Sequence, residues 1–427
     1  MERVWRSEAA RLIAGVARLT RDVGLAEEFA QDALIAAIEH WPTEGLPDNP
    51  GAWLMATAKR RALDRLRQHA MQARKHEQLG HEADALGEHL VPDIAEAVAN
   101  AQQDDIEDDL LRLIFTACHP VLSRDAQLAL TLRVVGGLSV GEIARAFVVP
   151  EPTISQRIVR AKRTLAAARV PFETPGAAER PARVSTVLEV VYLIFNEGYA
   201  ATSGDAWTRP ALCEEALRLG RMLASLERED AEVHGLLALM ELQASRLGAR
   251  TGADGEPVLL PDQDRSRWDH GAIARGLAAL SRCEAIHRAR GGAVGAPGAY
   301  ALQAAIAACH ARAPTSAQTD WNRIVSLYGA LRAIAPSPIV ELNRAVAVGM
   351  ASGPAAALEI VDALDAGGDL ARYHLLPSVR ADLLEKLGRG AEARAAFLKA
   401  ASLAQNARER AMLAARAQAL SDPARPD

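Results

Sequence analysis

The sequence predicts an all-α fold, because nearly every periodic stretch has helical spacing and none shows sustained strand-like alternation. The composition agrees, since 49% of the 427 residues are hydrophobic and only 4% are aromatic, with abundant alanine and leucine. A chain of this length is expected to form more than one domain. Proline-rich and like-charged stretches between the helical blocks indicate where the domains end.

The overall charge and the cysteines limit the classes of protein to which this chain can belong. The net charge of −5 is too small to indicate a partner, so the placement of the charges matters instead. The four cysteines form no C-x-x-C pair, and the adjacent Cys118 and His119 lack the spacing of helical metal ligands. We therefore expect no disulfide framework, no metal and no cofactor. The charged N-terminus, and the absence of a run of roughly 18 apolar residues, predict a soluble cytoplasmic protein with no membrane partner.

Residues 1–75 are expected to form the first domain. Its first strong helix, LAEEFAQDALIAAIEHW, repeats apolar residues at helical spacing: Leu25, Phe29, Leu34, Ile38 and Trp41. After the loop PTEGLPDNP, the helix GAWLMATAKRRALDRLRQHAMQARK carries many cations, including Lys59, Arg60, Arg61 and Arg65. Trp41 and Trp53 could stack on bases, but both fall on apolar stripes, which favours a place in the core.

An acidic segment follows over residues 76–109. It has no lysine or arginine and culminates in DDIEDD, from Asp104 to Asp109, which predicts an at least partly solvated linker. A compact helical domain is expected at 110–172. The proline-rich stretch VPFETPGAAERPAR marks the next boundary, and residues 184–427 are predicted to form a further helical domain.

This C-terminal domain contains a weak internal repeat. The segments LNRAVAVGMASGPAAALEIVDAL and RADLLEKLGRGAEARAAFLKAAS superpose with a shift of 36 residues (345 to 381), which aligns Ala345 with Ala381 and Ala357 with Ala393. Recurring small residues and a glycine-containing turn are typical of tetratricopeptide-type helix pairs, whose period is close to 34. An alanine-rich bundle without repeats would share some of these features.

The segment GLSVGEIARAFVVPEPTISQRIVRAKRTLAA (137–167) has the pattern of a helix-turn-helix. Ser139 and Glu142 form a capping box, VVPEP is the predicted turn, and Pro152 is tolerated in the first turn of the second helix. That second helix has an apolar stripe formed by Ile154, Ile158, Ala161 and Leu165.

The opposite side of the second helix suits a DNA major groove, where arginine reads guanine, glutamine reads adenine and other side chains hold phosphates. The candidate DNA contacts on this helix are Thr153, Ser155, Gln156, Arg157, Arg160 and Arg163. A solvated basic face on an ordinary bundle helix is the alternative. The short turn, the capping box and the acid-free second helix favour DNA.

Three stretches together resemble one family. LSVGEIARAFVVPEPTISQRIVRAKRTL resembles region 4 of extracytoplasmic-function sigma factors, which reads the minus-35 promoter element. LAEEFAQDALIAAIEHW resembles their region 2 helix that grips the clamp helices of the polymerase β′ subunit, and NPGAWLMATAKRRALDRLRQ resembles the helix behind it. YLIFNEGYAA and LLPDQDRSRWD resemble a subgroup with a tetratricopeptide-like C-terminal extension.

The resemblance implies a sigma factor and not an enzyme. Such a factor binds core RNA polymerase, through the β′ clamp helices and the β flap, and directs promoter-specific initiation of transcription. The implied polymerase contacts are Glu28, Gln31 and Asp32. The implied contacts to the opened minus-10 element are Lys59, Arg60, Arg61 and Arg65.

The chain departs from the family at three positions. Arg60 stands where the family usually has asparagine, and Pro152 and Ser155 replace a glycine and a lysine. We therefore expect promoter preferences that differ from those of the family. By the same resemblance, the acidic linker is expected to run through polymerase channels that otherwise hold nucleic acid.

Two other functions are open from the sequence. A helix-turn-helix regulator with a tetratricopeptide-like sensor would explain residues 110–427, but it gives AEEFAQDAL and WLMATAKRRALDRLR no role. An enzyme in residues 184–427 would rest on DQDRSRWDH and NEGYAA alone. A salt-bridged loop that caps a helix over Asp269–Cys283 explains the residues of DQDRSRWDH as well, and we favour this interpretation. We expect the C-terminal domain to bind a protein or peptide ligand and to regulate the sigma part.

Overall fold

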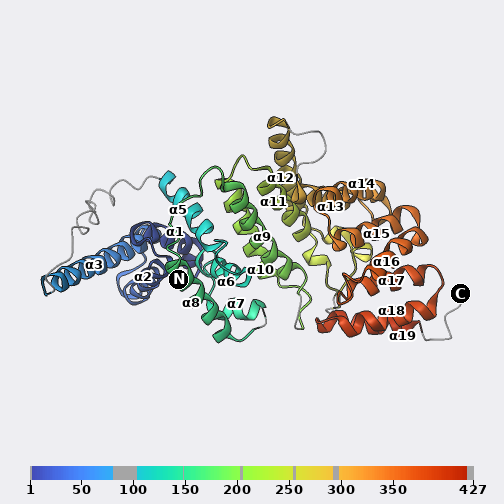
Figure 1. Ribbon diagram of the computed structural model, residues 1–427, viewed down its shortest axis with the longest axis horizontal. Coiled ribbons are helices and arrows are strands. Elements are labelled where there is room, and N and C mark those ends of the chain that lie inside the picture. Colours follow the sequence, from blue (N-terminus) through green and yellow to red (C-terminus); the bar gives the residue numbers. More distant parts are fainter. Residues whose placement is uncertain are drawn as a thin grey trace. The chain divides into compact units, whose positions relative to one another are not determined.

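Figure 1 shows the computed structural model, which describes residues 2–79, 103–147, 149–201, 205–252, 256–291 and 298–420. Regular structure in these ranges is helical, and the β-contact found there is an isolated antiparallel bridge between Thr251 and Pro257. The prediction of an all-α fold is confirmed. The helices form two compact units, Met1–Val190 and Val191–Asp427.

The N-terminal part of the first unit is a three-helix bundle of α1 (Glu2–Thr20), α2 (Val23–Glu44) and α3 (Pro50–Leu79). Asp22 caps α2 by accepting a hydrogen bond from the backbone N–H of Leu25 at 3.0 Å. The helix continues through Pro42 to Glu44, so part of the predicted loop is helical.

The buried face of α2 only partly coincides with its apolar repeat. Phe29 and Trp41 are buried, whereas Leu25 and Ile38 are exposed by 38% and 52%. The reason is that small residues make the contact with α1 and α3, which lets the three backbones approach closely. The buried alanines of α2 are Ala26, Ala30, Ala33, Ala36 and Ala37.

The two tryptophans of the bundle pack on each other. Trp41 is buried and Trp53 is half-buried, and their ring centres lie 5.4 Å apart in an edge-to-face arrangement. The core position is confirmed for Trp41, and Trp53 packs against it at the edge of the core.

The predicted acidic linker is partly helical. Residues 76–79 belong to the end of α3, and residues 103–109 begin α5 (Gln103–Ala117), while residues 80–102 lie outside the described ranges. Asp109 is buried and pairs with Arg112 at 2.7 Å and with Arg18 of α1 at 3.7 Å. The acidic run therefore ends inside a packed helix, because the carboxylate of Asp109 finds cationic partners there.

The helix-turn-helix consists of α7 (Val140–Phe147) and α8 (Glu151–Ala167), with α6 (Arg124–Val134) packed against α8. The capping box is confirmed: Glu142 N–H donates to Ser139 Oγ at 3.2 Å, and Ser139 N–H donates to Glu142 Oε2 at 2.8 Å. The turn is shorter than predicted, since α8 already begins at Glu151. The predicted apolar stripe is buried throughout, as Ile154, Ile158, Ala161 and Leu165.

Helix α9 (Arg180–Tyr199) crosses the division between the two units. In its first half, Arg183 Nη2 donates to the backbone oxygen of Phe115 at 2.6 Å, and Glu189 pairs with Arg124. The first unit thus extends beyond the proline-rich boundary that the sequence predicts.

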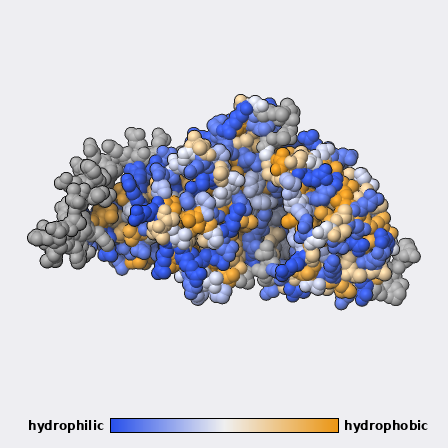
Figure 2. All heavy atoms as spheres, in the orientation of Figure 1, coloured by the Kyte–Doolittle hydropathy of each residue, from blue (hydrophilic) through white to orange (hydrophobic). Residues whose placement is uncertain are grey.

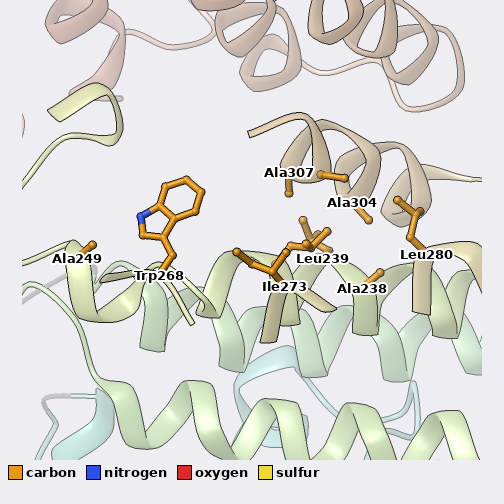
Figure 3. Close-up of a cluster of buried hydrophobic side chains, with 10 residues drawn as sticks. Ala238, Leu239, Ala249, Trp268, Ile273, Leu280, Ala304 and Ala307 are labelled. Carbon is orange, nitrogen blue, oxygen red and sulfur yellow. The ribbon is translucent and has the colours of Figure 1, made fainter. Parts of the chain in front are cut away.

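The second unit continues with α10 (Pro210–Leu226), α11 (Ala231–Ala244), α12 (His270–Ala289) and α13 (Ala299–Arg312). Three short turns of 3₁₀ helix connect α11 to α12: η1 (Leu247–Ala249), η2 (Leu260–Asp262) and η3 (Arg265–Arg267). A buried cluster of aliphatic side chains from α11, α12 and α13 fills the centre, with Trp268 and Ala249 at one end (Figure 3).

The remaining helices pack in sequence, each on the next: α14 (Trp321–Ile334), α15 (Pro338–Ser352), α16 (Pro354–Gly367), α17 (Leu375–Lys386), α18 (Gly390–Leu403) and α19 (Ala407–Ala419). The two predicted repeats correspond to the pairs α15–α16 and α17–α18. Their aligned alanines, Ala345, Ala381, Ala357 and Ala393, are each 0% exposed.

The outer sides of these helices carry a mixed surface. On the face shown in Figure 2, hydrophobic residues lie among hydrophilic ones, as expected where each helix buries one side.

Candidate DNA and polymerase interfaces

Helix α8 presents the polar side chains that the sequence predicts. Thr153, Ser155, Gln156, Arg160 and Arg163 are all exposed, opposite the buried stripe. Within the described residues, Arg160 and Arg163 make no ion pair, so their guanidinium groups are available to an external anion. An exposed cationic face with a rigid apolar back is the arrangement that a major groove requires.

Arg157 differs from its neighbours on α8. It is half-buried, and its guanidinium pairs with the carboxylate of Asp125 on α6 at 3.0 Å. An internal partner of this kind fixes the position of the side chain. The nearby carboxylate also partly neutralises the guanidinium charge, so Arg157 attracts DNA phosphates less strongly. The structure therefore separates Arg157 from the more exposed Arg160 and Arg163.

The cations predicted to meet the minus-10 element lie on α3. Arg60 and Arg65 are exposed, while Lys59 and Arg61 are half-buried. Arg61 pairs with Asp32 of α2 at 3.6 Å. A residue predicted to bind DNA therefore forms an ion pair with a residue predicted to bind polymerase.

The predicted polymerase contacts share one side of α2. Glu28 is exposed, and Gln31 and Asp32 are half-buried. Ile35 and Ile38 lie on the same side at helical spacing, and each is 52% exposed. Sequence reasoning missed Ile35 as a surface residue. Its position seven residues after Glu28 is the signal that could have placed it there.

A buried ion cluster joins α2 to the helix-turn-helix. Glu27 is only 2% exposed, and its carboxylate pairs with Arg133 of α6 at 2.5 Å and with Lys162 of α8. Gln31 Nε2 also donates to Glu27 Oε1, at 2.6 Å. We call Glu27, Arg133 and Lys162 the interregion ion cluster. The predicted clamp-binding helix and the predicted DNA-reading helix are thereby bound to each other.

Two clefts flank this contact within the first unit. One, of about 700 Å³, is lined by Arg18, Arg21, Lys162 and Arg169 among others. The second, of about 500 Å³, lies between the predicted polymerase face and α7 and is lined by Gln31, Ile35, Glu142 and Arg145 among others. Part of the predicted polymerase surface therefore faces the helix-turn-helix.

In the second unit, the stretch DQDRSRWDH forms the capping loop that the sequence offers as one interpretation. Asp269 accepts from the N–H of Ala272 at 3.0 Å and so caps α12, and Asp264 accepts from the N–H of Ser266 at 2.9 Å. Capping does not explain Trp268, which is 4% exposed, or Arg265, which turns inward toward backbone oxygens.

Three of the four cysteines, Cys118, Cys213 and Cys283, are buried and poorly suited to act as nucleophiles. Burial raises the pKa of Cys118 to about 11 and the pKa values of Cys213 and Cys283 to about 12, so these thiols stay protonated at neutral pH. No group of three or more His, Cys, Asp and Glu side chains in the described ranges could hold a metal ion.

Comparisons with known families find two matches within the first unit. The model for sigma-70 region 2 matches residues 4–71, which hold α1 to α3 up to residue 71, and the model for sigma-70, region 4 matches residues 112–165, which hold the helix-turn-helix. The chain belongs to the sigma-70 family. The sigma factor therefore binds core RNA polymerase and promoter DNA and directs promoter-specific initiation of transcription. Proteins of this family are initiation factors rather than enzymes.

The comparisons say less about the rest of the sigma factor. Residues 183–284 match a family of unknown function, DUF6596. An uncharacterized protein of Rhizobium meliloti (strain 1021) is 43% identical over 400 residues, which are 93% of this chain and 90% of that protein. No solved structure matches the chain. Among the described helices, none is long and apolar enough to cross a membrane.

Proposed function

We propose that α8 reads the minus-35 element through Thr153, Ser155, Gln156, Arg157, Arg160 and Arg163. The observation that carries this assignment is the exposed, cationic side of α8 above a fully buried apolar stripe. In the same proposal, Lys59, Arg60, Arg61 and Arg65 of α3 bind the opened minus-10 element. The proposal also has region 4 contact the β flap and the factor act in the cytoplasm.

The polymerase-binding surface in this proposal is the side of α2 that bears Glu28, Gln31 and Asp32. Its support is the neighbouring pair Ile35 and Ile38, which are each 52% exposed beside these polar side chains. Burial of both side chains against the β′ clamp helices would add hydrophobic stabilisation to the polar contacts.

The proposal includes a closed state of the free factor. The minus-10 and minus-35 elements are separated by about 25 base pairs, which span about 85 Å at about 3.4 Å per base pair. Regions 2 and 4 cannot bridge that distance while Glu27 pairs directly with Arg133 and Lys162. Binding to polymerase and promoter therefore requires the interregion ion cluster to separate.

Substitution of Lys162 by methionine tests the closed state. The change removes one partner of Glu27 but leaves Arg133 in place, which makes opening easier without leaving Glu27 unpaired. Because the apparent affinity is the intrinsic affinity reduced by the open fraction, we expect Lys162→Met to tighten binding to core polymerase by about two- to tenfold. Lys399→Met, which removes a surface pair with Asp365, is the matched control and should leave the affinity unchanged. Equal or weaker binding by Lys162→Met would contradict the closed state.

We also propose that the second unit regulates the sigma part and replaces a separate inhibitor. A truncation that tests this role should retain α9, because Arg183 and Glu189 belong to the packing of the first unit. A chain that ends after Tyr199 is expected to differ from the full-length factor in promoter output or in polymerase affinity. If both quantities are unchanged, the regulatory role is wrong.

A further inference from the structure

Three arginines and three aromatic rings of the second unit form one connected group. The guanidinium of Arg250 lies 3.9 Å from the ring centre of Tyr199 and 5.4 Å from that of Trp207. Arg246 lies 5.7 Å from Tyr199 and 5.9 Å from Trp268, and Arg265 lies 4.8 Å from Trp268. We call these six residues the arginine–aromatic cluster.

The fold gathers the cluster from four separate places. Tyr199 ends α9, Trp207 precedes α10, Arg246 and Arg250 flank η1, and Arg265 and Trp268 belong to the turn around η3. In Figure 3, Trp268 stands beside Ala249 at the end of the aliphatic core, with its indole nitrogen on the side of Ala249, away from the aliphatic side chains. All six residues lie in the segment 183–284 that matches the family of unknown function.

The cluster contains buried donors that have no acceptor. Within the described part of the chain, no hydrogen-bond partner exists for five buried nitrogens: Nε of Arg246, Arg250 and Arg265, and Nε1 of Trp207 and Trp268. Every one of these atoms is a donor. Buried polar groups are otherwise almost always hydrogen-bonded, so a concentration of orphan donors indicates a missing acceptor.

The charges of the cluster are also uncompensated. No acidic side chain of the described residues pairs with Arg246, Arg250 or Arg265, and Arg246 is only 8% exposed. A buried cation without a partner destabilises the folded chain, because its charge leaves water without compensation. The ring contacts of Arg246 lie close to the limit of about 6 Å for a cation–π interaction and offset little of that cost.

Arg265 shows what a structural arginine looks like at the same place. Its Nη1 donates to the backbone oxygens of His310 and Ala313 at 2.6 Å, and its Nη2 donates to Thr319 Oγ1 at 3.1 Å. Among the residues that the structure describes, the side chains of Arg246 and Arg250 have no such hydrogen-bond acceptors. Packing of arginines on the aromatic rings does not by itself explain why Arg246 and Arg250 are buried without hydrogen-bond acceptors.

The neighbouring His310 lies in the positive field of the cluster. Burial, together with the charges of Arg246 and Arg265, lowers the pKa of His310 to about 3. The imidazole is therefore neutral at physiological pH, and the positive charge of the cluster comes from the arginines.

We propose that the arginine–aromatic cluster is a binding site for a small organic anion. Its carboxylate or phosphate group would accept hydrogen bonds from Arg246 and Arg250, since the guanidinium fork matches both groups. A flat apolar part would lie against the rings of Tyr199, Trp207 and Trp268. This inference goes beyond the proposed function, because it assigns a ligand class to the second unit whatever its effect on transcription.

Thermal unfolding of the full-length factor tests the site, with tryptophan fluorescence as the readout. The probes are inorganic phosphate and benzoate, and chloride at matched ionic strength is the reference. We expect at least one of the two probes to raise the Tm in a saturable way that chloride does not reproduce. Arg246→Met and Arg250→Met should each weaken this effect at least about tenfold in Kd. Arg290→Met, at an exposed position near the end of α12, removes the same charge and should leave binding intact.

The unliganded variants separate a ligand site from a structural one. Without probe anions, Arg246→Met should keep or raise the Tm, because it replaces an unpaired buried charge by an apolar chain of similar length. A lower Tm, with no stabilisation of the wild type by either probe, would assign the cluster a purely structural role and overturn the proposal. Stabilisation that survives both substitutions would overturn it too. Transcription plays no part in these measurements, so their failure is distinct from failure of the proposed function.

Discussion

At the scale of single residues, the arginines of α8 differ in whether they have an ion-pair partner. Arg160 is exposed without an ion-pair partner in the described residues, whereas Arg157 is tied to Asp125. The free guanidinium of Arg160 can form a two-pronged contact with a guanine edge. The pair between Arg157 and Asp125 also holds α8 against α6.

We expect Arg160→Ala to reduce discrimination among minus-35 sequences by about 1–3 kcal/mol, because a two-pronged base contact is lost. Initiation measured on a set of minus-35 variants gives this quantity. Arg323→Ala, an exposed charge change in the second unit, is the control. A uniform loss on all templates would instead identify Arg160 as a phosphate contact.

His310 makes stability depend on pH. Its pKa in the folded chain, about 3, is below its unfolded value of 6.5, so the unfolded state binds the proton more tightly. The stability is therefore fully present above about pH 6.5 and is lost as the pH falls toward 3. The groups around the imidazole are the ring of Trp321, 5.2 Å away, and the guanidiniums of Arg246 and Arg265.

Substitution of His310 by glutamine should make the Tm less sensitive to pH between about 7.5 and 5, because the substituted side chain does not titrate. The measurement is a series of thermal unfolding curves for both proteins. A pH dependence identical to that of the wild type would show that other groups control acid stability.

At the scale of elements, the start of α7 depends on a reciprocal pair of hydrogen bonds. Ser139→Ala removes the side chain that accepts from the N–H of Glu142. We expect a loss of about 0.5–2 kcal/mol in unfolding free energy, measured by denaturant titration. Ser139→Asp retains a capping oxygen and should recover most of the loss; failure to recover would contradict the capping role.

The helix pairs of the second unit depend on small residues at their contacts. Ala393 is 0% exposed between α17 and α18, whereas Ala395 on the same helix is exposed. We expect Ala393→Leu to destabilise the unit by about 1–3 kcal/mol through overpacking, and Ala395→Leu to have little effect. Chemical unfolding of the two variants checks this difference, and equal effects would contradict the assigned packing.

Much of this element structure follows from sequence, for identifiable reasons. The stripe of α8, the capping box and the alanines of the repeat are local patterns, and the structure buries or bonds each of them as predicted. The buried face of α2 was harder, because alanines rather than Leu25 and Ile38 fill it. The helical end of the acidic segment depends on Arg18, a partner that lies far away in the chain.

The site residues also divide into those that local sequence predicts and those that depend on distant partners. The exposed side of α8 follows from helical periodicity, but the interregion ion cluster joins Glu27 to residues more than a hundred positions away. In the arginine–aromatic cluster, Tyr199 and Trp268 likewise both lie near the guanidinium of Arg246, although they are far apart in the chain. No local pattern encodes such pairings, because they arise only when helices pack.

At the scale of the whole molecule, regions 2 and 4 hold each other in the first unit, and a factor bound to a promoter needs them apart. Arg61 pairs with Asp32, so a group assigned to DNA and a group assigned to polymerase occupy each other. Lys162 pairs with Glu27 and so joins the two regions beside them. Core polymerase must replace these internal contacts with its own. We therefore expect the free factor to bind duplex promoter DNA weakly and the polymerase complex to bind it tightly.

The most direct test of the account is run-off transcription with purified core polymerase and a library of genomic templates. The account predicts that the full-length factor supports initiation from specific promoters, that core polymerase alone does not, and that the factor alone has little affinity for the same DNA. Absence of promoter-specific initiation on every template, together with tight binding of duplex DNA by the factor alone, would contradict it.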